Sequence, residues 1–331
     1  MNTSDIQRIV ANFIPDSDIK LIGTESGEYN KAYLFSTERE KYALRVKKKP
    51  VTIIYADVAY EVEFMENLAS AQKRIHIPTT IKTVSGDLLF ENETAYYNLQ
   101  TLVPGGRRID KWYGSHTLSL DDIKEIFSAL AVLHNVSRGF HLTNSKKSPT
   151  VFEYLIDYRK LLQNKLPPTA FSEVVNKNRR FLEEKLDALE HTLHKLHYEN
   201  CKKYPTHYDT SAMNVLWEGG KVVSLIDFDW AQDSTLEFDF CHSAMHSCGS
   251  YIAGGADNNL FDEEKVKVAL ESYNKEAKVP FENRELIAAL LDASSFFLAF
   301  WGLQTFLVEK NRESYYVGFF QSGLDRLKNP I

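Results

Sequence analysis

The sequence predicts an α+β fold in which an antiparallel sheet comes first and a mostly helical region follows. Two observations lead to this prediction. Short β-type runs separated by turn residues fill the N-terminal third, which is typical of a meander and lacks the helical crossovers that parallel strands require. A Pro-Gly-Gly break then follows the last of these runs, and beyond it long segments show helical periodicity.

Composition limits the class of protein. A chain of 331 residues with 44% hydrophobic content can bury a real core. The net charge of −6, without a run of five like charges, argues against a nucleic-acid partner. The N-terminus lacks the pattern of a signal peptide, and we expect no apolar stretch long enough to span a bilayer, so the prediction is a cytoplasmic protein without a membrane partner. The three cysteines, without a C-x-x-C pair, are expected to be reduced thiols.

The first part of the chain is expected to hold one short helix and three strands. Ser4 can cap a helix whose apolar residues, from Ile6 to Phe13, follow helical spacing. Short β-type runs follow at 19–23, 32–36 and 42–46. The segment 23–30 joins the first two runs and contains Ser26 and Gly27, but it matches neither G-x-x-x-x-G-K-[ST] nor G-x-G-x-x-G. Alone, it counts only as a turn.

A charged pair is expected between the third strand and the next helix. Arg45 lies in the third strand, and the segment 57–71 shows helical periodicity with Glu61 on or near its apolar face. A buried carboxylate needs a partner, and Arg45 is the candidate. Glu63 competes with Glu61 for this role, and full solvation of the three glutamates at 61, 63 and 66 also stays open.

A boundary is expected at residue 103. Further β-type runs at 80–84 and 94–102 end at Val103-Pro104-Gly105-Gly106, which predicts one unit over 1–103 and a second over 104–331. Helices are then expected at 120–136, 151–162 and 171–197, and again from residue 260 onward.

The segment from His207 to Trp230 carries the chemistry. Two short β-type runs, joined by a turn at Gly219-Gly220, predict a hairpin whose ends bring Asp209, Asn214 and Asp227 together. Clustered hard oxygen ligands of this kind suit Mg²⁺, which binds through one or two side chains plus substrate phosphates.

The spacing from Asp209 to Asn214, followed by Asp227 after a strand, matches a kinase catalytic loop and metal-binding aspartate. Here the chain resembles the aminoglycoside phosphotransferase and choline kinase family. The resemblance implies a bilobal protein-kinase-like fold with an antiparallel-sheet N-lobe and a mostly helical C-lobe. It also implies Mg²⁺-dependent transfer of the γ-phosphate of ATP, or of GTP, to the hydroxyl of an aminoglycoside, choline-like alcohol or sugar.

The resemblance assigns a role to each end of the hairpin. Asp209 would accept the proton of the acceptor hydroxyl, while Asn214 and Asp227 would bind Mg²⁺. On the phosphate side, Arg45 stands where protein kinases have lysine, and Glu61 would be its partner.

The same resemblance implies nucleotide contacts from the N-terminal part. The loop with Ser26 and Gly27 would lie over the phosphates, and backbone groups of Gln100 and Leu102 would contact the base.

Several features depart from the family. Commoner members read His-Gly-Asp-hydrophobic-His-Pro-Gly-Asn, whereas this loop has Tyr208 and the run from Thr210 to Met213, and Arg45 replaces lysine. A catalytically impaired nucleotide-binding protein therefore stays open, as does a protein Ser/Thr kinase of the same fold. The absence of an A-P-E element from the sequence favours a small-molecule acceptor.

Secondary candidates surround the hairpin. Strand alternation could aim Asp229 to the same side as Asp227, and a solvent-facing Asp229 stays equally open. His207 and Asp239 are expected to be structural. His242 and His246 lie four residues apart, but without the glutamate of H-E-x-x-H they favour a packed helix over zinc.

The sequence says least about the acceptor substrate and the oligomeric state. The aromatic C-terminal region is expected to be core, with some rings walling the acceptor site. An acidic protein with aromatic walls could hold a cationic substrate, with Asp233, Glu237 and Asp257 as weak candidates for its acidic part. We expect a monomer or a homodimer.

Overall fold

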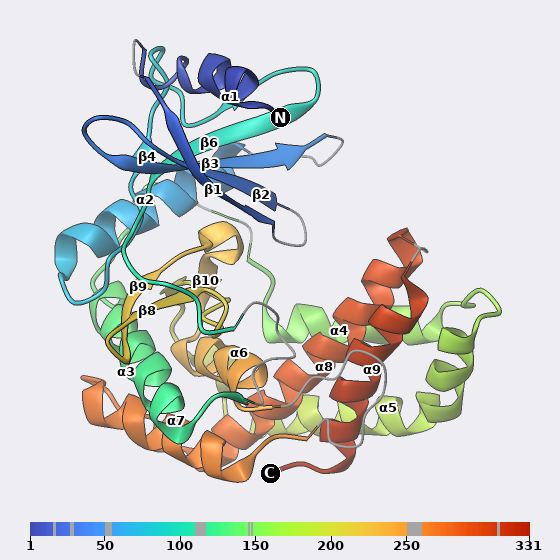
Figure 1. Ribbon diagram of the computed structural model, residues 1–331. Helices are drawn as coiled ribbons and strands as arrows, with labels where there is room; N and C mark the ends of the chain where they lie inside the picture. Colours follow the sequence, from blue (N-terminus) through green and yellow to red (C-terminus); the bar gives the residue numbers. More distant parts are fainter. Residues whose placement is uncertain are drawn as a thin grey trace.

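The structure is a computed structural model that describes residues 1–15, 18–26, 30–49, 55–109, 117–144, 146, 148–249, 260–309 and 312–331. An antiparallel sheet with one short helix forms the upper part of the molecule in Figure 1, and helices fill the lower part. The N-terminus lies beside the sheet and the C-terminus among the helices. The predicted α+β fold is confirmed, and the site described below lies where the two parts meet.

The N-terminal sheet has six strands, all paired antiparallel, in the order β1-β2-β3-β6-β4, with β5 also on β6. Their bounds are Lys20–Ser26, Asn30–Ser36, Lys41–Lys48, Thr80–Ile81, Phe90–Glu91 and Ala95–Thr101 for β1 to β6. The run predicted at 80–84 is only a two-residue strand, and β5 was not predicted. Strands this short leave too few residues for a period-two pattern to be recognised.

Helix α1 (Thr3–Val10) covers the sheet and buries Ile6, Ile9 and Val10 in a cluster with sheet residues such as Leu44. The prediction that Ser4 caps this helix is wrong. Asn2 is the cap, because its side chain accepts a hydrogen bond from the backbone N–H of Asp5, whose carboxylate accepts one from the N–H of Asn2.

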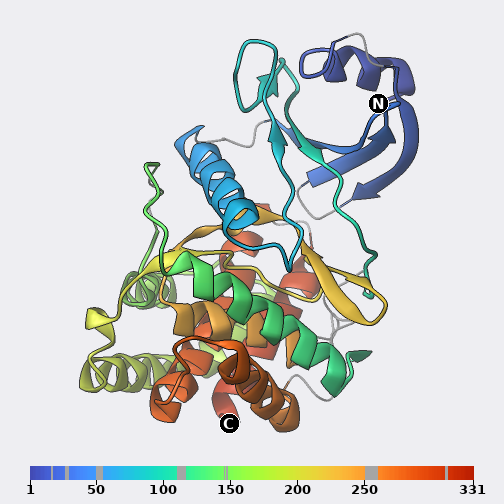
Figure 2. The same ribbon diagram turned by 90° about the vertical axis from the view of Figure 1, so that its left-hand side faces the viewer.

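Helix α2 (Tyr55–Ala71) crosses between the sheet and the lower helices, as Figure 2 shows. Its buried apolar residues, among them Phe64 and Leu68, belong to the same core as the lower helices. Polar contacts reinforce this placement, because the Tyr60 hydroxyl donates to Asp233 at 2.7 Å. Glu63 accepts hydrogen bonds from the backbone and side chain of Thr143 and of Asn144. The helix that carries Glu61 is therefore fixed to the lower part.

The lower part is built from helices α3 to α9: Leu120–Ser137, Val151–Gln163, Ala170–Lys195, Leu236–Ser247, Glu263–Glu276, Arg284–Glu309 and Glu313–Lys328. The helices predicted from periodicity at 120–136, 151–162 and 171–197 are confirmed to within two residues at each end. Ser119, Thr150 and Thr169 cap their N-termini with side-chain oxygens, which satisfies backbone N–H groups that have no partner inside a helix.

The predicted hairpin is present as β8 (Val215–Glu218) and β9 (Lys221–Leu225), paired from Val215 opposite Leu225 to Glu218 opposite Lys221. A second antiparallel pair, β7 (Tyr204–Thr206) with β10 (Gln232–Ser234), flanks it and was not predicted. The β7–β10 pair brings the segment before His207 and the segment after Trp230 side by side. The segment 207–230 is thereby held at both of its ends.

Helix α8 corrects one expectation from the sequence. Its residues Arg284–Val308 are long and apolar enough to cross a membrane by length and composition. However, 78% of the apolar window is buried inside the protein, as in the core helix of a globular fold.

Close packing of α8 against α9 depends on Gly323. A Cβ built at this position would overlap the carbonyl oxygen of Ser295 and lie 2.8 Å from the Cβ of Ala299. We expect Gly323→Ala to lower the free energy of unfolding by about 1–3 kcal/mol, the usual cost of overpacking, measured as a lower urea midpoint at constant m value. Gly139→Ala is the matched control, because its Cβ would make only an ordinary 3.6 Å contact with Val136 O. Equal midpoints for the two variants would contradict the packing argument.

Candidate active site

His207 fixes the loop that presents Asp209. The backbone N–H of Asp209 donates to Nδ1 of His207 at 3.2 Å, so the ring proton is on Nε2, which lies 3.0 Å from the carbonyl oxygen of Ile226. Burial lowers the pKa of His207, which keeps the ring neutral. The ring therefore joins the loop to the end of β9, the structural role expected from the sequence.

Asn214 fixes the side chain of Asp209. Its Nδ2 donates to Oδ2 of Asp209 at 2.7 Å and to the backbone oxygen of Asp209 at 2.9 Å. Because the amide nitrogen is used in this way, the Asn214 oxygen points to the other side and can serve as a ligand. The predicted pair of Asp209 and Asn214 is therefore one hydrogen-bonded unit.

Asp227 lies at the other end of the hairpin, directly after β9. The N–H of Ile226 donates to the Asn214 carbonyl at 2.9 Å, which brings Asp227 next to the loop. Asp227 has a left-handed backbone with φ of 66°, uncommon for a residue other than glycine, and its side chain is 40% exposed. Strained backbone of this kind occurs often at functional sites.

Asp229 reaches the same site by a route that strand alternation did not predict. The residues Phe228–Trp230 form a single turn of 3-10 helix, so the chain does not continue as a strand after Asp227. The turn nevertheless brings both carboxylates to the guanidinium of Arg45, at 2.6 Å for Asp227 and 3.1 Å for Asp229.

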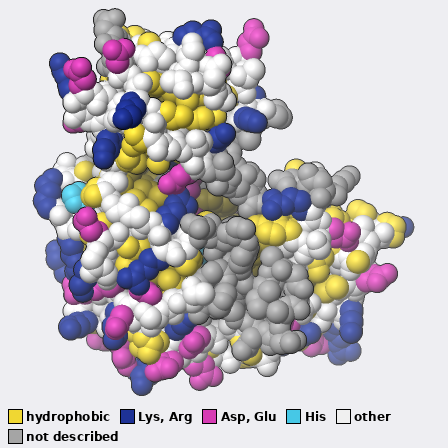
Figure 3. Space-filling view, in the orientation of Figure 1, with side chains coloured by type: hydrophobic (Ala, Val, Ile, Leu, Met, Phe, Trp, Pro, Cys, Tyr) yellow, Lys and Arg dark blue, Asp and Glu magenta, His cyan; other side chains and the backbone are white. Residues whose placement is uncertain are grey.

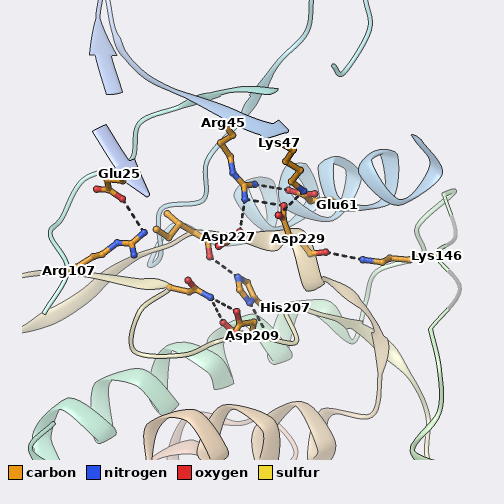
Figure 4. A network of polar contacts seen from close by, with 12 residues as sticks. Glu25, Arg45, Lys47, Glu61, Arg107, Lys146, His207, Asp209, Asp227 and Asp229 are labelled. Atoms are coloured by element: carbon orange, nitrogen blue, oxygen red, sulfur yellow. Dashed lines mark hydrogen bonds and ion pairs between the residues drawn. The ribbon is translucent and has the colours of Figure 1, made fainter. Parts of the chain in front are cut away.

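Arg45 is the centre of a network that joins the sheet to the hairpin (Figure 4). It extends from β3, and besides the two aspartates it contacts Glu61 of α2 at 3.4 Å. Burial alone would lower the pKa of this guanidinium, but the carboxylates outweigh burial and raise it, so Arg45 is always charged. The expected pairing of Arg45 with Glu61 rather than Glu63 is present, since Glu63 binds the loop after α3 instead.

Two lysines that were not predicted for the site extend this network. Lys47 Nζ lies 2.7 Å from Asp229, and Lys146 Nζ donates to the backbone oxygen of Asp229 at 3.1 Å. Both approach from elements far from the hairpin in sequence, which is why spacing could not identify them. In Figure 4, Lys47 approaches Asp229 from above and Lys146 from the right.

The cluster still holds more negative than positive groups. The carboxylates are Glu61, Asp209, Asp227 and Asp229, and the cations are Arg45, Lys47 and Lys146. Burial, followed by the charge of Asp229, raises the pKa of Glu61 to about 7. Burial, followed by the charge of Asp227, raises the pKa of Asp209 well above the usual carboxyl range. Burial is the larger cause of each shift, because it disfavours the charged form of a carboxyl group, and the neighbouring aspartate adds to it.

The residues present fit a magnesium ion. Asn214 and Asp227 offer an amide oxygen and a partly exposed carboxylate, the hard oxygen donors that Mg²⁺ prefers when it also binds phosphates. Within the described part of the chain, no three or more His, Cys, Asp or Glu side chains form a metal cluster. A closed all-protein metal site is therefore not the arrangement seen here.

Three of the residues predicted to contact the nucleotide, Ser26, Gln100 and Leu102, lie in or directly after strands of the N-terminal sheet. The N–H of Leu102 donates to the Lys41 carbonyl at 2.8 Å, and the predicted contact of Leu102 with a base stays a prediction. Gln100 lies inside the sheet opposite Ala43 and Thr80, so its peptide groups are positioned for strand pairing. Gly27 lies outside the described residues. Ser26 ends β1, and its predicted phosphate contact stays a prediction.

Asp239 joins three helices of the lower part. It is fully buried, and Oδ2 lies 2.8 Å from Nε2 of His134, whose Nδ1 lies 2.8 Å from the Tyr273 hydroxyl. Asp239 thus links α6 to α3 and α7. This placement agrees with the structural role expected from the sequence.

A cavity of about 190 Å³ opens beside Asp209. His242 and His246 of α6, interpreted from their spacing as members of a packed helix, both line it. Among the acidic candidates for an acceptor site, neither Asp233 nor Glu237 lines the cavity, and Asp257 lies outside the described residues. The sequence contains the spacing of the histidines, but only the packing of α6 decides which way they face.

Comparison with known proteins gives one family and many similar folds. The model described as "Phosphotransferase enzyme family" matches residues 20–269, well over half of the chain. A comparison of this chain with curated proteins found no match.

Solved structures with a similar fold include a microcompartment-associated aminopropanol kinase, with a TM-score of 0.71, 15% identity and coverage of 99% of this chain and 97% of that one. An amicoumacin kinase in complex with AMP-PNP and Ca²⁺ has a TM-score of 0.66 and 12% identity, covering 100% and 95%. The GDP complex of aminoglycoside 2'-phosphotransferase-IIIa has a TM-score of 0.63 and 14% identity, covering 99% and 98%. At these identities the likeness shows the fold alone.

Proposed function

This chain belongs to the phosphotransferase enzyme family, and on that premise we propose that it transfers the γ-phosphate of ATP to a hydroxyl group of a small molecule. One observation carries the proposal. Asp209, held by Asn214 at 2.7 Å, faces the cavity beside Asp227 and Arg45, so a base, hard oxygen ligands and a phosphate-binding cation converge at one point.

The acceptor side of the reaction is assigned to Asp209. The acceptor hydroxyl oxygen forms a bond to the γ-phosphorus, the bond from that phosphorus to the bridging oxygen breaks, and ADP leaves. Asp209 orients the hydroxyl and takes its proton. Phosphoryl transfer leaves little covalent work to the protein, so the role of Asp209 is mainly positioning and electrostatic stabilisation.

The phosphate side is assigned to Arg45, Asn214 and Asp227. The two oxygen-bearing side chains would hold Mg²⁺, which would supply positive charge to the phosphate oxygens. Arg45 contacts Asp227 at 2.6 Å, so its guanidinium is already in place to be shared with phosphate. Glu61 holds Arg45 from the side of α2.

The nucleotide is ATP by default, with GTP as the alternative. Structures similar in fold hold AMP-PNP in one case and GDP in another. Every residue carries the same main-chain groups, so the sequence does not tell whether a carbonyl such as that of Leu102 would contact adenine or guanine. We assign the protein to the cytoplasm, as a monomer or homodimer.

A coupled assay of ADP release against a panel of hydroxyl compounds tests the proposed activity, with ATP and GTP compared in parallel. Mg-nucleotide binding is followed separately as a shift in melting temperature. Turnover of a small alcohol is the expected result. A melting shift without turnover of any compound would favour an impaired nucleotide-binding protein, and phosphorylation of proteins alone would favour a protein kinase.

The pH profile should report the raised pKa of Asp209. The base must be ionised to accept a proton, so kcat/KM is expected to fall on the acid side at a pH above that of an ordinary carboxyl group. The charge of Asp239 contributes to this raised pKa, so Asp239→Asn should move the acid limb to lower pH. Glu237→Gln, on the same helix, is the control expected to leave the limb in place. An unmoved limb in Asp239→Asn would contradict this account.

A further inference from the structure

The cavity beside Asp209 is mostly apolar. Its large apolar lining residues include Met213, Trp230, Met245, Phe297, Leu298 and Trp301. In Figure 3, yellow hydrophobic surface is visible in the hollow between the upper and lower parts, close to acidic and basic side chains. A compound whose hydroxyl reaches Asp209 would therefore place the rest of its body against aromatic and aliphatic side chains.

The carboxylates that line this cavity all belong to the charged cluster. They are Asp209, Asp227 and Asp229, of which Asp229 is bound by Arg45 and Lys47, and Asp227 by Arg45. Across the described part of the lining, no other acidic side chain is present to pair with an ammonium group. The cation in the lining, Arg107, is paired with Glu25 at 3.1 Å.

Two neutral histidines of α6 also line the cavity. His242 and His246 occupy successive turns of α6, with ring centroids 5.0 Å apart. Burial lowers the pKa of His242 to about 4 and that of His246 well below its usual value, so neither ring carries charge at neutral pH.

Each histidine has a distinct position. His246 Nε2 lies 4.0 Å from Oδ1 of Asp209, close enough for both to meet one small ligand. His242 is 4% exposed and packs edge-on against Phe297, and within the described chain its Nδ1 has no hydrogen-bond partner. A buried polar atom without a partner is costly, and a ligand hydroxyl or carbonyl would satisfy it.

We propose that the acceptor is an uncharged alcohol with an aromatic or aliphatic body, which binds the apolar wall and carries a second neutral polar group that hydrogen-bonds His246 or His242. The proposal rests on the phosphotransfer function and narrows its substrate class. It differs from the cationic acceptor that the acidic and aromatic composition favours, because net charge does not specify which groups line the cavity. An amine-bearing acceptor would need a carboxylate partner for its ammonium group, and in the described lining Asp227 and Asp229 are already bound by Arg45 and Lys47.

The test compares acceptors that differ in charge. Benzene-1,4-dimethanol has an aromatic body and two neutral hydroxyls, and 4-(aminomethyl)benzyl alcohol keeps the shape but replaces one hydroxyl with an ammonium group. Choline and kanamycin complete the set. The wild-type protein is expected to show a kcat/KM at least tenfold higher for the diol than for the matched amine. A preference for the amine, choline or kanamycin would overturn the proposal.

Variants of His246 test its contact with the acceptor. We expect His246→Leu to raise KM for the diol about tenfold or more, and His246→Gln to recover part of this loss because it keeps a donor and an acceptor. His191→Leu is the matched control, since His191 is exposed on α5 away from the cavity lining. Unchanged constants in His246→Leu would count against the contact.

A second variant, Trp230→Glu, tests the proposal independently if His246→Leu does not fold. Trp230 lines the cavity and its side chain is 44% exposed, so Trp230→Glu adds a carboxylate at a position that tolerates charge. The ratio of amine to diol turnover should rise at least tenfold, and an unchanged ratio would contradict the assigned wall.

Binding measurements separate this proposal from the proposed function. Calorimetry in the presence of Mg-AMP-PNP reports acceptor binding without turnover. Binding of the diol with no phosphorylation of any alcohol would overturn the phosphotransfer function while supporting the assigned pocket chemistry. Phosphorylation restricted to cationic alcohols would support the phosphotransfer function and overturn the assigned pocket chemistry.

Discussion

Asp209→Ala is expected to lower kcat by about 10²–10⁴-fold, the usual contribution of a positioned general base. The affinity for Mg-nucleotide should change little, because Asp209 faces the acceptor cavity and Asn214 rather than the phosphate-binding cation. Coupled ADP release gives kcat, and calorimetry with Mg-AMP-PNP gives the affinity.

The reference substitution for this measurement is Asp187→Ala, which removes a carboxylate that is 75% exposed on α5. It should leave kcat unchanged. Asp209→Asn adds information, because it keeps the shape of the side chain and removes only the ability to take a proton. Wild-type turnover of the true acceptor by Asp209→Ala would remove the assignment of Asp209.

Asp227→Ala should instead weaken Mg-nucleotide binding by at least about 100-fold. Loss of a residue that only hydrogen-bonds to a metal ligand costs up to about 100-fold in affinity, and loss of a ligand itself should cost at least as much. The reason is geometric. Asp227 is the exposed carboxylate of the cluster and lies next to Asn214, so its loss removes a direct ligand. Nucleotide titrations at several Mg²⁺ concentrations measure this effect, and the dependence on Mg²⁺ should largely disappear.

Asp157→Ala provides the comparison for that titration. This aspartate is 57% exposed on α4 and forms a surface ion pair with Lys160, where little binding energy is at stake. Nucleotide affinity in Asp227→Ala equal to that of Asp157→Ala would show that Asp227 does not hold the ion.

Local sequence was sufficient where the relevant contacts are close along the chain. Asp209 and Asn214 are five residues apart in one loop, and Asp227 follows the return strand of a hairpin whose turn contains two glycines. Hairpin geometry brings these ends together almost independently of the rest of the fold. The helical segments were similarly predictable, because their apolar periodicity extends over many residues.

Prediction failed where an element was too short or where two conformations fit the same residues. β5, β7 and β10 contain two or three residues each. The residues after β9 could continue as a strand, but they form a 3-10 turn that brings Asp229 to Arg45 by another path. Asn2 and Ser4 are both good caps, and the choice between them depends on where the first turn begins.

The sequence by itself determined which groups the candidate site contains, namely carboxylates, an amide and a guanidinium, together with the order of sheet and helices. Only the tertiary structure decided which side chains share that site. Two lysines, Lys47 and Lys146, contact Asp229, and His246 lies close to Asp209. They come from the sheet, from the loop that follows α3, and from helix α6, which pack around the hairpin. Such contacts depend on the relative positions of whole elements, which are set by burial of the common core and have no periodic signature in the chain.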